Sequence, residues 1–140
     1  MTFLEIFEEM HRRDQGVTSG ALAGVDGLTV EEWRAPGDDR DLSALCAEVV
    51  QFFRESDRIA VENGLGSAEE VHLGGDRAQV FLRKVTAEYF LVIVTDPGTV
   101  PGKCRFLLRQ AVRRRHLAVL QHDLRRVGGA LAGFLLQARR

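Results

Sequence analysis

The sequence predicts an α+β fold with the element order helix, two strands, helix, three strands, helix. Three observations indicate it. Two long segments repeat apolar residues at helical spacing behind residues that cap helices. Asp26 and Gly27 form a strong hairpin-turn signal between runs of small and β-branched residues. Tyr89 to Val94 is almost continuously apolar, which is typical of a central strand covered on both faces.

The first helix is expected to run from Thr2 to about Arg13. Thr2 and Glu5 form a capping box, and apolar residues follow at helical spacing: Phe3, Ile6, Phe7 and Met10. Two antiparallel strands are then expected on either side of the Asp26-Gly27 turn. The glycines before that turn indicate either a bulged strand or close packing of a helix on the backbone: Gly16, Gly20 and Gly24.

A long second helix is predicted from Asp41, as its cap, to about Asn63. Gly64 ends it. Ala47, Val50 and Phe52 fall outside the predicted buried stripe, so this helix has more apolar surface than one sheet contact requires. A second packing partner is therefore implied. The predicted buried stripe itself consists of Leu42, Leu45, Cys46, Val49, Phe53 and Ile59.

Three further strands and a last helix complete the predicted domain. Glu70 to Leu73 is a short strand, Ala78 to Val85 alternates in polarity, and Tyr89 to Val94 is the central strand. Pro101 suits the first turn of the final helix. The chain is expected to divide into a domain at residues 1–116 and a basic amphipathic C-terminal helical extension at residues 117–140.

The charge distribution is uneven although the formal net charge is −1. Residues 103–140 hold ten of the 19 basic residues and one of the 20 acidic residues. Clustered arginines suit an acidic protein partner, or nucleic acid and anionic lipid. The scarcity of aromatic side chains for base stacking disfavours nucleic acid, and a membrane surface is not expected either. The basic patch consists of Arg113, Arg114, Arg115, Arg125 and Arg126.

The sequence lacks the motifs of an enzyme with its own active site. No phosphate-binding G-x-x-x-x-G-K-[ST] loop occurs, and His116 and His122 lack the spacing of a helical metal site. Cys46 and Cys104 lie on predicted buried stripes, which favours core thiols over nucleophiles. No cofactor or metal is expected. A signal peptide and a membrane-spanning run are both missing, so a cytoplasmic location is expected.

The element order, the segments GALAGVDGLTV and YFLVIVTD, and the loop into a Lys/Arg-rich helix resemble the Roadblock family. Within it the chain is similar to bacterial MglB-type partners of Ras-like GTPases, over about residues 2–116. The resemblance implies a five-stranded antiparallel sheet, with the long second helix on one face and the other two helices on the opposite face. It also implies homodimers in which third strands pair, second helices lie side by side, and one ten-stranded sheet forms.

The resemblance assigns two sets of residues by position. The implied dimer interface contains Ala47, Val50, Glu70, Val71, His72 and Leu73. The implied GTPase-binding platform on the second helix contains Ala44, Glu48, Gln51, Phe52 and Glu55.

MglB-like regulators are expected to order catalytic groups of the GTPase without inserting an arginine. Arg54 and Arg58 are therefore not assigned a catalytic role. Two alternatives stay open. Phe52 could serve only the dimer while the polar platform residues are merely solvated. The protein could instead be a non-catalytic dimerisation scaffold that tethers a larger assembly through its basic extension.

Overall fold

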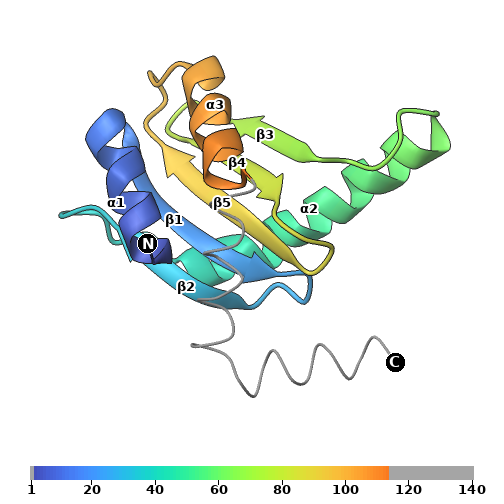
Figure 1. Ribbon diagram of the computed structural model, residues 1–140, viewed down its shortest axis with the longest axis horizontal. Helices are drawn as coiled ribbons and strands as arrows, with labels where there is room; N and C mark the ends of the chain where they lie inside the picture. Colours follow the sequence, from blue (N-terminus) through green and yellow to red (C-terminus); the bar gives the residue numbers. More distant parts are fainter. Residues whose placement is uncertain (1, 114–140) are drawn as a thin grey trace.

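The computed structural model describes residues 2–113 and confirms the predicted order of elements (Figure 1). Five strands form one antiparallel sheet in the order β2-β1-β5-β4-β3. The predicted boundary at residue 116 and the extension at 117–140 lie outside the described residues. The elements are α1 (Phe3–Arg13), β1 (Val17–Gly24), β2 (Thr29–Arg34), α2 (Leu42–Glu62), β3 (Glu70–Gly74), β4 (Gln79–Lys84), β5 (Tyr89–Thr95) and α3 (Pro101–Ala111).

The sheet separates two hydrophobic cores. Figure 1 shows α1 and α3 on one face and the long α2 on the other, as the resemblance to Roadblock domains implied. The central strand β5 contributes side chains to both cores, which explains why its sequence is continuously apolar. β1 pairs with β5 from Val17 opposite Thr95 to Gly24 opposite Tyr89, and this pairing joins the N-terminal hairpin to the β4–β5 hairpin.

The core under α1 and α3 is centred on Phe7, whose side chain is fully buried. A Cβ atom on Gly20 would lie 2.6 Å from the Phe7 ring, so the glycine allows α1 to pack directly on β1. The Phe7 ring also stacks on Trp33, with 6.2 Å between ring centroids. The pairing of β1 shifts register as well, between Leu22 and Ala23. Both expectations for the glycine-rich strand, a bulge and close helix packing, are therefore confirmed.

The core under α2 shows where the predicted stripe of that helix was wrong. Val50 was expected outside the stripe but is 1% exposed and packs against the sheet. Ile59 was expected inside it but is 46% exposed. A helix lying on a sheet buries an arc wider than one narrow stripe, which includes position 50. The C-terminal part of α2 extends past the sheet in Figure 1, so Ile59 has less sheet to cover it.

The ends of α2 and the two cysteines agree with the sequence. The Asp41 carboxylate accepts a hydrogen bond from the Ala44 amide at 3.0 Å, and Gly64 follows the helix with a φ of 73°. Cys46 and Cys104 are free and buried. Burial raises the pKa of the Cys46 thiol to about 12 and that of Cys104 to about 11. Such thiols are poor nucleophiles at neutral pH.

Candidate protein-interaction surface

Within residues 2–113, the edge strand β3 pairs on one side only, so the backbone hydrogen-bonding groups of its other side are free. Hydrogen bonds join the amide of Gly75 to the carbonyl of Ala78, and the amide of Lys84 to the carbonyl of Glu69. In an antiparallel ladder the bonded positions alternate, so the odd-numbered residues of β3 bond to β4. The backbone groups of Glu70, His72 and Gly74 therefore point away from the sheet. Such an edge is a template for another strand.

An apolar surface lies beside this edge on the α2 face of the sheet. We call it the α2–β3 flank and define it by Phe52, Ile59 and Leu73, which are 42%, 46% and 51% exposed. Leu45, Phe52 and Ile59 recur every seven residues and so share one side of α2. Leu45 and Leu73 also line a groove of about 250 Å³ between α2 and the β3–β4 turn. Exposed apolar surface next to a free edge indicates a protein interface.

The opposite, α3-facing side of β3 is polar and ordered. The His72 ring stacks on Phe81, with 4.2 Å between centroids and an interplanar angle of 2°. His72 Nε2 lies 2.9 Å from Gln79 Oε1. The Gln79 amide nitrogen already donates to the carbonyls of Asp96, Pro97 and Thr99. Its oxygen is therefore the acceptor, and His72 carries its proton on Nε2.

Glu70 links β3 to its two neighbours through ion pairs. Its carboxylate oxygens lie 2.7 Å from the Arg83 guanidinium of β4 and 2.7 Å from the Arg109 guanidinium of α3. Burial alone would raise the pKa of Glu70, but Arg109 and Arg83 hold this pKa below its ordinary value. Next to this group is a cavity of about 170 Å³, which we call the β3 cavity. It is lined by Glu70, Val71, His72, Phe81, Leu82, Arg105 and Leu108.

Replacing Glu70 with glutamine should lower the stability of the fold by about 1 kcal/mol at pH 7, because two charge-assisted hydrogen bonds are lost. The lowered pKa means that the ionised carboxylate stabilises the folded state fully above its unfolded value, near 4.5. This contribution is lost as the pH falls through the folded value. Urea unfolding should therefore show a larger difference from the wild type at pH 7 than at pH 3. Glu62→Gln is the control, since its ion pair with Arg58 is more exposed.

Comparison with solved structures identifies proteins that have the same fold. An MglB with tetrameric arrangement aligns with 86% of this chain and 88% of its own, with a TM-score of 0.75 and 20% identity. Gliding protein MglB from Thermus thermophilus aligns over 84% and 87%, with a TM-score of 0.73 and 19% identity. A Roadblock/LC7 domain from Streptomyces avermitilis aligns over 81% and 93%, with a TM-score of 0.71 and 13% identity. This chain has the Roadblock fold.

The Roadblock fold is established by structure alone. No protein-family model matches the sequence, and no curated protein matches it. Because unrelated functions can share a fold, the fold alone does not assign a function.

The residues expected to form the GTPase platform lie on the exposed side of α2 in this Roadblock fold. Ala44, Glu48, Gln51, Phe52 and Glu55 are all exposed. These five side chains do not have one chemical character, however. Phe52 belongs to the α2–β3 flank, whereas the polar members face away from the sheet. Arg58 hydrogen-bonds to Glu55 and lowers the pKa of that carboxylate.

The residues expected at the dimer interface lie in three separate places in the structure. Val71, His72 and Leu73 lie on the edge strand with Glu70, as expected. Val50 lies in the core and cannot reach a partner. Ala47 lies on the other side of α2, where its Cα would be 3.2 Å from a Cβ on Gly27 of the β1–β2 turn. The side of α2 next to β3 instead presents Leu45, Phe52 and Ile59.

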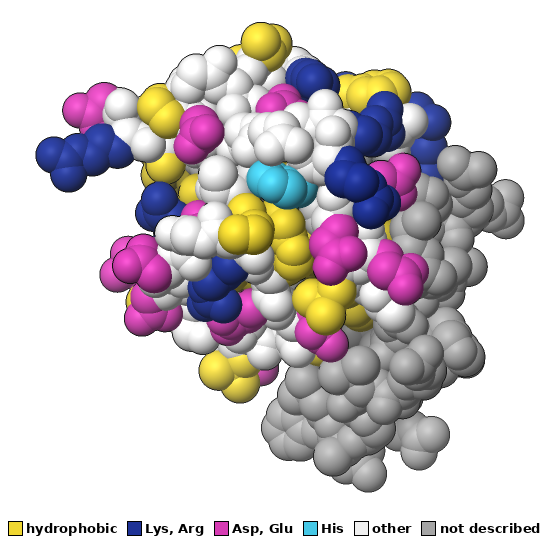
Figure 2. Space-filling view, turned by 90° about the vertical axis from the view of Figure 1, so that its left-hand side faces the viewer, with side chains coloured by type: hydrophobic (Ala, Val, Ile, Leu, Met, Phe, Trp, Pro, Cys, Tyr) yellow, Lys and Arg dark blue, Asp and Glu magenta, His cyan; other side chains and the backbone are white. Residues whose placement is uncertain are grey.

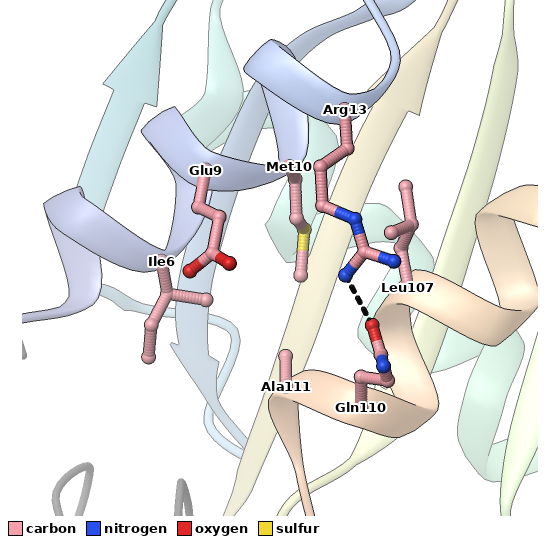
Figure 3. A pocket seen from close by; sticks show the side chains of 7 residues that line it. All are labelled: Ile6, Glu9, Met10, Arg13, Leu107, Gln110 and Ala111. Carbon is pink, nitrogen blue, oxygen red and sulfur yellow. Dashed lines mark hydrogen bonds between the residues drawn. The ribbon is translucent and has the colours of Figure 1, made fainter.

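A further pocket on the described surface is too small for a ligand. A pocket between α1 and α3 has a volume of about 20 Å³, enough for a single water (Figure 3). The apolar residues around it are already buried, and Arg13 closes it by bonding to Gln110. Figure 2 shows one side of the molecule, where acidic and basic side chains are interspersed. Hydrophobic side chains lie among them near the centre of this view.

Several expectations concern groups that the structure describes only in part. Of the predicted basic patch, only Arg113 lies within the described residues; it sits 5.8 Å from the Phe106 ring centroid. In residues 2–113 no three His, Cys, Asp or Glu side chains come together as a metal site. Within the same range, no helix is long and apolar enough to cross a membrane.

Proposed function

We propose that the chain is a homodimeric cytoplasmic regulator that binds a small Ras-like GTPase and stimulates its GTP hydrolysis. The observation that carries the proposal is the free β3 edge beside the exposed α2–β3 flank. On a Roadblock fold, these features provide one surface for self-association and leave the outer side of α2 for a partner. The resemblance to MglB-type regulators supports a Ras-like GTPase as that partner.

Self-association through β3 has one preferred register. A five-residue strand that pairs with its own copy in antiparallel fashion keeps all five residues paired only if the twofold axis passes through His72. In that register Glu70 lies opposite Gly74 of the second copy, and His72 lies opposite His72. These are the positions whose backbone groups are free, so every outward group gains a partner. The α2–β3 flanks of the two copies would then be buried together.

The outer side of α2 would be duplicated in this dimer and would present acidic and amide groups to the GTPase. Glu48, Gln51 and Glu55 are exposed and suit basic or polar groups beside the nucleotide. The arginines of α2 are engaged elsewhere. Arg54 donates to the Val25 carbonyl, and Arg58 is held by Glu55 and Glu62. These contacts favour stimulation by ordering the groups of the GTPase itself, without an inserted arginine.

Binding is tested with the Ras-like GTPase encoded nearest to the gene for this chain. The GTP-loaded GTPase is mixed with the protein, and complex formation and phosphate release are measured. Glu48→Arg should weaken the complex at least about tenfold by reversing a charge at its centre. Glu8→Arg, an equally exposed reversal on α1, should leave it unchanged.

Two outcomes would change the proposal. If the protein binds no Ras-like GTPase in either nucleotide state, the proposed function is wrong. If it binds the GTPase without accelerating phosphate release, the scaffold alternative is favoured.

A further inference from the structure

The β3 cavity becomes part of a larger site when two copies meet through β3, so this inference rests on the dimer of the proposed function. The cavity lies between α3 and the edge strand, on the face opposite α2. α3 contacts β4 and reaches the edge strand through the ion pair of Arg109 with Glu70. In the dimer only the two β3 strands would separate the two cavities. Each measures about 170 Å³, and together they reach the lower end of the roughly 300–1,000 Å³ of typical ligand sites.

The charges around this joint cavity are unbalanced. Within residues 2–113, each copy contributes Glu70 and Arg105 from the cavity lining, and Arg83 and Arg109 as the partners of Glu70. Glu70 is neutralised by Arg83 and Arg109. Among residues 2–113 the Arg105 side chain forms no ion pair or hydrogen bond. The two copies would therefore bring a surplus of positive charge to the twofold axis, which favours a bound anion there.

The hydrogen-bonding groups on the floor of the cavity also suit an anion. His72 donates its Nε2 proton to Gln79, so its Nδ1 is an acceptor that has no partner in the described part of the chain. It can accept a hydrogen bond from the proton that phosphate carries at neutral pH. Stacking on Phe81 fixes the position of the His72 ring on β3. A guanidinium presents paired N–H donors that fit two oxygens of a tetrahedral oxyanion. The two Arg105 side chains could therefore hold one oxyanion from both sides.

We propose that the homodimer binds one phosphate-class anion on its twofold axis, between Arg105 and His72 of both copies. The phosphate is either free or the monoester group of a small metabolite. Neither copy alone has the complete site, so the anion binds the dimer in preference to the monomer. By mass action, phosphate at 100 times its dissociation constant tightens the dimer about 100-fold.

The test is sedimentation velocity of the full chain over a range of protein concentrations. Sodium phosphate or glycerol 3-phosphate is added while sodium chloride keeps the ionic strength constant. Both anions should tighten the dimer if a monoester fits, and only free phosphate should do so if the cavity excludes the ester. Titration calorimetry with sodium phosphate should give one site per dimer.

Arg105→Gln is the test variant, because Arg105 is exposed and its loss should not affect folding. It should weaken phosphate binding at least about tenfold and abolish the phosphate effect on the dimer. The dimer measured in chloride should be unchanged or tighter, since repulsion across the axis falls. Arg12→Gln, an exposed arginine on α1, is the matched control and should respond to phosphate as the wild type does.

The outcomes separate this inference from the proposed function. A stable dimer that does not respond to phosphate, or one for which chloride is equally effective, overturns the anion site and leaves GTPase regulation intact. An equal phosphate response in Arg105→Gln also overturns it. A protein that stays monomeric at every concentration overturns both the anion site and the proposed dimer.

Discussion

Replacing His72 with proline should convert the proposed dimer into a monomer, with self-association weakened at least about 100-fold. The His72 amide points away from β4, so in the symmetric register it donates to His72 of the second copy. Proline removes this donor from both copies and places its ring against the incoming strand. The bonds between β3 and β4 use the odd-numbered residues and are not affected. Proline is tolerated at such edge positions.

The measurement is sedimentation velocity, with circular dichroism to show that the variant is folded. His72→Ala is the matched control. It keeps the backbone donor and removes only the ring, so its dimer should stay within about tenfold of the wild type. A His72→Pro variant that is folded and dimerises like the wild type would show that the copies do not meet through β3.

Replacing Phe7 with alanine should lower the free energy of unfolding by about 3–5 kcal/mol. The ring is fully buried between Gly20 and Trp33, and alanine cannot fill the space. Gly20 has no side chain that could move into the gap. Domains of this size are stabilised by only about 5–15 kcal/mol, so a large fraction of the variant is expected to unfold in mild urea.

Urea unfolding followed by circular dichroism measures this effect. Phe106→Ala removes the same ring from an exposed position on α3, where the side chain is 45% exposed. It should cost no more than about 1 kcal/mol. Similar losses for the two variants would contradict the central position of Phe7 in the core.

Elements with local signals could be predicted from the sequence. The capping box at Thr2, the cap at Asp41 and the Asp26-Gly27 turn depend on residues only a few positions apart, so their geometry can be read without tertiary structure. The apolar run of β5 is similarly informative, because only a central strand buries both of its faces. The layers of the fold were predicted through the resemblance to Roadblock domains.

The details of the surface depend on distant residues and could not be predicted in this way. Periodicity placed Val50 outside the core and Ile59 inside it, because it does not show where α2 crosses the sheet or passes its edge. Glu70 was assigned to a dimer interface, but its ion pairs come from β4 and α3. The bond between His72 and Gln79 depends on the carbonyls of a third segment, after β5. No sequence spacing indicates such contacts.

The pairing of β1 with β5 has a consequence for how the chain folds. Leu22 pairs with Leu91, and every other neighbour in the sheet is a hairpin partner close in sequence. The β1–β2 and β3–β4–β5 units can therefore form locally, but they join only when a long loop containing α2 closes. Closing such a loop costs chain entropy before the central contacts form, which slows folding. Until then both inner edges are exposed, and the unpaired β5 is the segment most prone to aggregate during synthesis.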